Sequence, residues 1–104
     1  MMPSDYVALD GSTQVFDLDA VVSIFDGHSR TRPGWNALVV YVPGNDVFVE
    51  LRSSPPNTHG DADDEAQEIS EQTLQEHHSI GADACAQIRK KPQAWLLIDE
   101  RPDA

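Results

Sequence analysis

The chain has 104 residues and carries 18 acidic against 7 basic side chains, a formal net charge of −11. This charge opposes binding to the phosphate backbone of nucleic acids and to anionic membrane surfaces. The length fits a single small domain over residues 1–104, with short tails at 1–4 and 99–104 and a flexible polar linker at about 53–62.

The first ten residues lack the basic start and the apolar segment of a signal peptide, and no stretch approaches the length of a membrane span. A lone cysteine, Cys85, has no partner within the chain for a disulfide, so the fold does not depend on oxidation. These features predict a soluble, cytoplasmic protein.

The N-terminal quarter predicts short strands. An apolar run at residues 6–9 favours a first strand. The next segment mixes helical and strand periods, and we expect a strand at 15–16, a helical turn at 17–20 and a strand at 21–25. A single helix over residues 17–25 remains the alternative.

Residues 35–52 give the strongest structural signal in the chain, two strands joined by a turn at residues 43–46. Pro43 and Gly44 suit the second and third positions of a type II turn, which needs a positive φ at the glycine. The run at 38–42 is apolar on both sides and predicts a central strand. The second strand alternates, with one apolar face and one mixed face: Val47, Val49 and Leu51 against Phe48, Glu50 and Arg52.

Acidic residues at 61–65 and basic residues at 89–91 complement the two ends of a helix dipole, so a helix is predicted over about 63–91. Ser79 and Gly81 leave open two shorter helices. The residues expected on the core-facing side share one helical stripe: Ile69, Thr73, Leu74, His77, Ile80, Ala84 and Ile88.

The short unbroken apolar run at residues 94–98 predicts a final strand that is covered on both faces. Strands come early in the chain and the helix comes late, which argues against alternating βαβ units. We therefore expect an α+β fold. It would have a mostly antiparallel sheet of four to five strands, with one long or two short helices packed on one face.

No residues stand out as catalytic, cofactor-binding or metal-binding. His77 and His78 are adjacent, and neighbouring side chains on a helix point about 100° apart, so the pair is poorly placed to share a metal. We expect His77 at the edge of the core and His78 in solvent. Cys85 is expected to be a small buried residue. The sequence thus favours a protein that is not an enzyme and has no cofactor.

Two surfaces are candidates for binding a protein partner. Arg30, Arg32 and Trp35 combine residue types that are enriched at binding hot spots. The second candidate is an acidic helix face suited to a basic partner, formed by Asp63, Asp64, Glu65, Glu68, Glu71 and Glu76.

The sequence therefore predicts a non-enzymatic interaction module. One alternative is an inhibitor or immunity-type protein whose acidic face blocks a basic, nucleic-acid-binding surface. The other is a self-associating structural subunit, because an unpaired strand edge can pair with a second copy of the chain.

Overall fold

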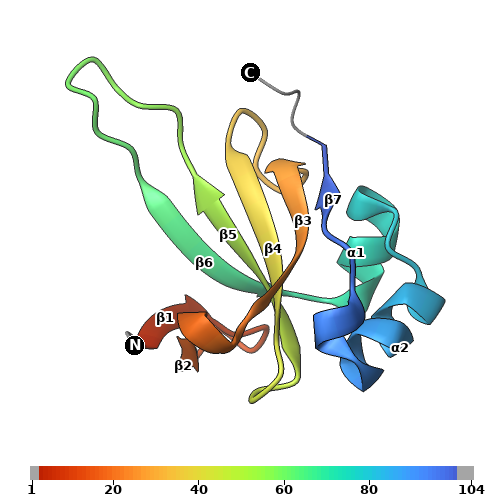
Figure 1. Ribbon diagram of the computed structural model, residues 1–104. Helices are drawn as coiled ribbons and strands as arrows, with labels where there is room; N and C mark the ends of the chain where they lie inside the picture. Colours follow the sequence, from red (N-terminus) through yellow and green to blue (C-terminus); the bar gives the residue numbers. More distant parts are fainter. Residues whose placement is uncertain (1–2, 101–104) are drawn as a thin grey trace.

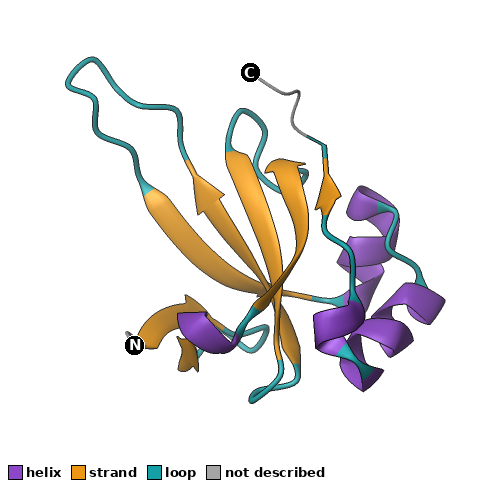
Figure 2. Cartoon of the chain, in the orientation of Figure 1, coloured by secondary structure: helices purple, strands orange, loops and turns teal. Residues whose placement is uncertain are grey.

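A computed structural model describes residues 3–100 of the chain and shows an α+β fold (Figures 1 and 2). The strands are β1 (Pro3–Val7), β2 (Thr13–Asp17), β3 (Val22–His28), β4 (Asn36–Val42), β5 (Val47–Ser53), β6 (Asp64–Ile69) and β7 (Ile98–Asp99). They form one sheet in the order β2-β1-β6-β5-β4-β3-β7. The helices are α1 (Glu71–His78) and α2 (Ala82–Lys90), with 3-10 turns η1 (Leu18–Ala20) and η2 (Pro92–Ala94).

The predicted hairpin is confirmed as β4 and β5, which pair antiparallel from Asn36 with Ser53 to Val42 with Val47. β4 lies between β5 and β3, as expected for a strand that is apolar on both sides. The type II turn is wrong. The backbone N–H groups of Asn45 and Asp46 both donate to the carbonyl of Val42, and Asp46 has the positive φ, 53°. A four-residue loop of this kind is commonly built around a type I turn, and aspartate tolerates the left-handed conformation.

Both helices cover one face of the sheet, at the right in Figure 1. α1 begins after Ser70, whose side chain accepts a hydrogen bond from the N–H of Thr73, and it ends at Ser79 in the left-handed conformation. The helices bury their apolar residues against the sheet, forming a core of Ile24, Phe25, Val39, Tyr41, Phe48, Ile69, Leu74, Ile80, Cys85 and Ile88. Cys85 is buried, as predicted.

A second, smaller core lies on the opposite face of the sheet. Here the β1–β2 hairpin brings Tyr6 and Phe16 together, with ring centroids 5.3 Å apart in an edge-to-face arrangement. They pack with Val40, Val42 and Val49. The alternation predicted for β5 therefore places Val49 in this core and Phe48 in the core under the helices.

The sheet differs from the prediction in size and direction. It has seven strands among the described residues, and two of its pairings, β1 with β6 and β3 with β7, are parallel. A short strand, a one-turn helix and a further strand do occupy the region from Thr13 to His28, so the single helix over 17–25 is wrong. The predicted linker at 53–62 falls on the end of β5 and most of the loop that joins β5 to β6.

The largest correction concerns the predicted helix at 63–91. Its first part is strand β6, and the rest is two helices separated at Ser79 and Gly81. The predicted strand at 94–98 is also wrong in position, because η2 includes residue 94 and β7 contains only Ile98 and Asp99. Of the predicted tails, Pro3 and Ser4 belong to β1, whereas residues 1–2 and 101–104 lie outside the described residues.

α1 contains only part of the predicted core-facing stripe, because Ile69 belongs to β6 and Ile80 follows the helix. Leu74 and His78 are the buried residues of α1, whereas His77 is exposed, the reverse of the expectation for the two histidines. No helix in the described part of the chain is long and apolar enough to cross a membrane.

Candidate functional site

The sheet opens between β1 and β6. These strands share a single ladder pair, Val7 with Gln67, whereas β5 and β6 pair over their full length, from Phe48 with Ile69 to Ser53 with Asp64. Figure 1 shows that the first end of β6, next to the long loop that precedes it, lies away from the short β1. Within residues 3–100, the backbone of residues 64–66 therefore has no strand partner on the β1 side.

The opening is hollow on both sides of the sheet. One hollow has a volume of about 530 Å³ and is lined by Asp5, Val7, Arg52 and Gln67 among others. The other has a volume of about 490 Å³ and includes Phe16, Leu18, Leu51 and Asp64 in its lining. Asp5, Arg52, Glu65 and Ala66 line both hollows. We call this feature the β1–β6 groove.

Arg52 forms the floor of the groove, with only 11% of its side chain exposed. Its Nη2 lies 2.9 Å from a carboxylate oxygen of Glu65 and donates to Gln67 at 2.9 Å. Its Nη1 donates to Thr31 Oγ1 at 3.1 Å. The guanidinium is thus held by groups from β6 and from the loop between β3 and β4.

A buried carboxylate lies behind Arg52. Glu50 has no exposed surface, accepts a hydrogen bond from Thr31 Oγ1, and has one oxygen 3.5 Å from Arg52 Nη1. Its other oxygen is 3.8 Å from His78 Nε2, too long for a hydrogen bond. Burial acts to raise the pKa of Glu50. The nearby His78 ring, the hydrogen bond from Thr31 and the positive charge of Arg52 together outweigh burial and lower the pKa from its ordinary value.

His78 is buried, and neither ring nitrogen has a hydrogen-bond partner in the described structure. Its ring packs against Phe25, with centroids 4.4 Å apart. Because His78 is the last residue of α1 and lies beside Glu50, the helix, the sheet and the loop before β4 all meet at this carboxylate.

The loop before β4 closes over this polar cluster. Ser29 accepts a backbone hydrogen bond from Arg32 through its hydroxyl, and the Ser29 N–H donates to the carbonyl of Trp35 at 2.8 Å. Gly34 has a φ of 87°, a conformation that favours glycine. The folded loop places the Arg32 guanidinium 3.9 Å from the centroid of the Trp35 ring.

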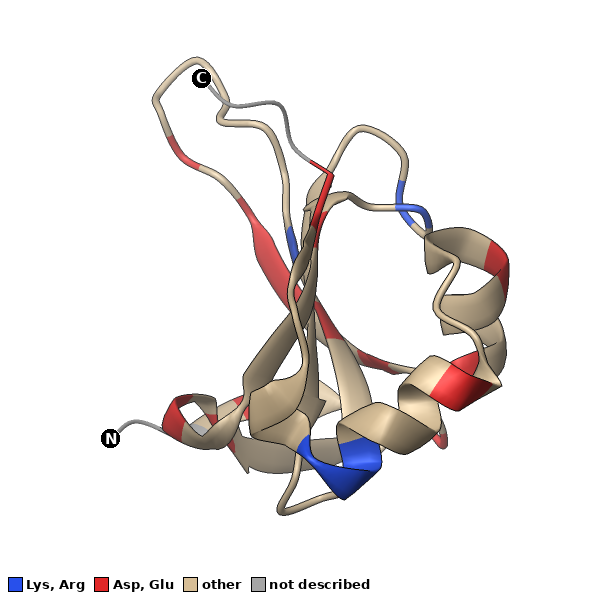
Figure 3. Cartoon of the chain, turned by 45° about the vertical axis from the view of Figure 1, so that its right-hand side comes forward, with Lys and Arg blue, Asp and Glu red and all other residues tan. Residues whose placement is uncertain are grey.

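The structure joins the two surfaces that the sequence predicted separately. Figure 3 colours arginine and lysine blue and aspartate and glutamate red along the backbone. Arg32 forms an ion pair with Glu65, which also pairs with Arg52, and Arg30 forms one with Glu100. These arginines therefore neutralise carboxylates of the same chain. Trp35 lies at the base of the loop, against Arg32.

The predicted acidic helix face does not exist, because its residues belong to three different segments. Asp63 lies in the loop, Asp64, Glu65 and Glu68 are on β6, and Glu71 and Glu76 are on α1. Several already have partners: Asp64 accepts from Ser53, Glu71 pairs with Arg89, and Glu76 accepts from Gln72. Of the six, only Asp64 and Glu65 line the groove.

Six residues of the cluster were not among the predicted partner-binding residues: Ser29, Thr31, Glu50, Arg52, Gln67 and His78. The sequence did contain one indication of Glu50 and Arg52. These two charged side chains follow Phe48 on the same face of the strand, whereas the residues between them are apolar and belong to the other face. The other residues come from distant parts of the chain and meet only in the fold.

Among residues 3–100, no three His, Cys, Asp or Glu side chains are placed to hold a metal ion. Burial, followed by the nearby Glu71, raises the pKa of the Cys85 thiol.

Comparison of the chain with protein-family models, with curated proteins and with solved structures gave no match.

Proposed function

We propose that the protein is a non-enzymatic interaction module that binds an extended segment of a basic partner protein in the β1–β6 groove. The observation that carries this proposal is the single ladder pair between β1 and β6 in the described part of the chain, where the backbone of residues 64–66 has no strand partner on that side.

An extended peptide that adds to a sheet edge gains main-chain hydrogen bonds whatever its sequence. Its side chains point alternately to the two faces of the sheet. The groove has a hollow on each face, of about 530 and 490 Å³, so both sets of side chains find space. The geometry of the groove supports an added strand better than a compact ligand.

The charge of the groove indicates that the partner segment is basic. Asp5 and Asp64 are exposed at the groove, and the arginine on its floor is already engaged with Glu65. Lysine or arginine side chains of a partner would therefore meet unneutralised carboxylates, within a chain of net charge −11. A nucleic-acid-binding protein whose basic surface is blocked in this way is one partner of the required kind.

The test is affinity capture from the native cell followed by mass spectrometry, with the unmodified chain compared against Asp64→Lys. Glu76→Lys is the matched control, because it makes the same charge change at an exposed position on α1. We expect the partner to be lost with Asp64→Lys, retained with Glu76→Lys, and released from the unmodified chain as salt rises. Hydrogen exchange on the complex should show new protection at residues 64–66.

A partner that stays bound to Asp64→Lys, or protection confined to α1, would contradict the proposal. Capture that is equally strong at low and high ionic strength would contradict its electrostatic part.

A second candidate function is self-association, favoured by exposed apolar side chains at both edges of the sheet. Val15 on the edge strand β2 is 55% exposed. At the other edge, Leu96 is 83% exposed and Leu97 and Ile98 follow it. Pairing between such edges builds oligomers. Light scattering over a range of concentrations decides this, since a constant monomer mass rules it out.

A further inference from the structure

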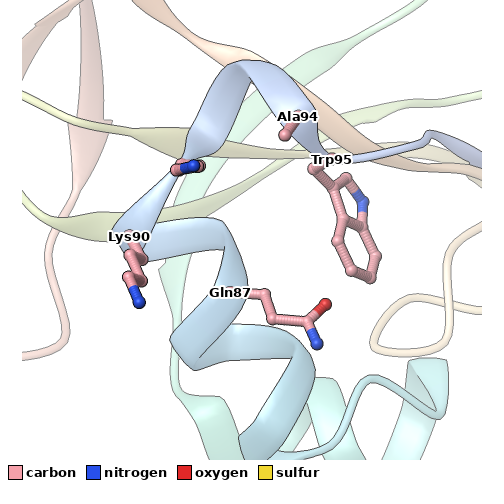
Figure 4. A pocket seen from close by; sticks show the side chains of 5 residues that line it. Gln87, Lys90, Ala94 and Trp95 are labelled. Atoms are coloured by element: carbon pink, nitrogen blue, oxygen red, sulfur yellow. The ribbon is translucent and has the colours of Figure 1, made fainter.

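A pocket of about 300 Å³ lies beside the C-terminal end of α2, away from the β1–β6 groove, and is lined by Gln87, Lys90, Lys91, Ala94 and Trp95. Figure 4 shows the Trp95 indole and the Gln87 amide at one side of this pocket and the Lys90 side chain at the other. Its volume is at the lower end of the range for small-molecule sites. The pocket therefore suits a ligand of one or two rings.

The two lysines differ from the arginines in the described part of the chain. Arg30, Arg32, Arg52 and Arg89 each form an ion pair with a carboxylate. Neither Lys90 nor Lys91 has a carboxylate partner among residues 3–100, and both side chains are exposed. Two adjacent ammonium groups without partners are a local attraction for an anion on an otherwise acidic protein.

The tryptophan supplies a fixed aromatic wall. Trp95 packs partly buried against the core under the helices, and its indole N–H points at the carbonyl of Ile24, 3.4 Å away. The ring is held in place before any ligand arrives, which reduces the entropy lost on binding. A flat ring is what stacks best on such a surface.

We propose that this pocket binds a small aromatic acid, with its ring against Trp95 and its anionic group near Lys90 and Lys91. The tryptophan at one side of the pocket favours a ring in the ligand, and the lysine at the other side favours a negative charge. The site is separate from the β1–β6 groove and does not depend on it.

The probe is 2-naphthoate, titrated into the ¹⁵N-labelled full chain and followed by NMR. We expect saturable shifts of the backbone amides around Gln87 and Lys91 and of the Trp95 indole N–H. Two further probes separate the contributions: 2-naphthamide keeps the rings without the charge, and acetate keeps the charge without the rings. Both should bind more weakly than 2-naphthoate.

The variant is Lys90→Gln with Lys91→Gln, which changes two exposed side chains and leaves the hydrogen bonds of the fold intact. Its affinity for 2-naphthoate should fall by about fivefold or more, as expected for two partly exposed ion pairs. The matched control makes the same change in net charge away from the pocket. It replaces exposed Thr58 and His59, in the loop between β5 and β6, by aspartate, and it should bind 2-naphthoate as the unmodified chain does.

Three results would overturn the proposal: no saturable shift with 2-naphthoate, shifts centred away from Trp95, or equal binding of 2-naphthoate and 2-naphthamide. An unchanged affinity in the double lysine variant would overturn the role of the ammonium groups.

Discussion

The helix-side face of the sheet has two halves of opposite character. Under the helices, Tyr41, Phe48 and Ile69 form one apolar row across three strands. Farther along the same face, beyond the end of α1, Glu50 and Arg52 continue the β5 alternation that begins at Phe48. One strand thus changes from apolar to charged on a single face.

The difference shows how the cover of a sheet decides its chemistry. Helices bury the apolar half with their own apolar residues, which removes hydrocarbon from water. The charged half is covered by the polar loop of Thr31 and Arg32, and each buried charge there has a partner. The first half stabilises the fold, and the second positions the floor of the groove.

The largest expected effect comes from breaking the apolar half. Phe48→Ala should lower the free energy of unfolding by about 4 kcal/mol, because Phe48 is only 2% exposed and its removal leaves a cavity. Urea denaturation monitored by circular dichroism measures this. As a control, Leu96→Ala at an 83% exposed position should change it by less than about 0.5 kcal/mol.

Breaking the charged half should cost somewhat less. Arg52→Met leaves Glu50 buried without its cation and should lower the free energy of unfolding by about 3 kcal/mol. Adding Glu50→Leu removes the unpaired charge as well, so the double variant should be more stable than Arg52→Met alone. Denaturation of both variants tests this, and equal stability of the two would show that Glu50 tolerates the loss of Arg52.

The two halves should also respond differently to acid. The folded-state pKa of Glu50 is lowered, so the carboxylate contributes stability above its unfolded pKa, near 4.5, and this contribution is lost as the pH falls through the lower folded value. In Glu50→Gln, the loss of unfolding free energy below about pH 4.5 should become shallower than in the unmodified chain, because the contribution of the Glu50 carboxylate is absent. Denaturation midpoints measured between pH 7 and pH 3 test this, and parallel curves for the two proteins would contradict it.

The smallest effect is expected at the outer cover of the charged half. Arg32→Ala removes an exposed ion pair and the contact with Trp35, and should lower the free energy of unfolding by about 0.5 kcal/mol. The Trp35 fluorescence should change at the same time. Arg30→Ala is the control, because its pair with Glu100 involves no aromatic ring, and it should leave that fluorescence unchanged.

The sequence predicts the apolar half well and the charged half poorly. Neighbouring residues such as Phe48 and Val49 point into different cores, so apolar side chains occur on both faces of β5. This alternation with a period of two residues predicts the strands of the β4–β5 hairpin directly. In β6 both faces carry polar residues beside the groove, so Glu65, Gln67 and Glu68 show no such period. The acidic residues there instead imitated the start of a helix, whose true beginning is capped by Ser70.

The candidate site was predicted only in part. Arg32 and Glu65 were singled out, but their contact depends on the fold of the Ser29–Trp35 loop, which no local pattern specifies. Glu50 and His78 are distant in the chain, and their meeting depends on where α1 begins. The sequence indicated His77 because the predicted stripe assumed one continuous helix that included Ile69 and Ile80. In the shorter α1 the buried histidine is His78, about one turn after buried Leu74.

The single ladder pair between β1 and β6 also affects how the molecule opens. The β1–β2 hairpin has a five-pair ladder of its own. Within residues 3–100 it joins the rest of the sheet through one ladder pair, Val7 with Gln67, through the packing of Tyr6 and Phe16, and through hydrogen bonds that the Asn45 amide donates to Tyr6 and to the carbonyl of Val15. Detaching it as a unit breaks few backbone hydrogen bonds compared with separating β4 from β5. We therefore expect the hairpin to detach from β6 before β4 separates from β5, and such an opening would widen the groove beside β6.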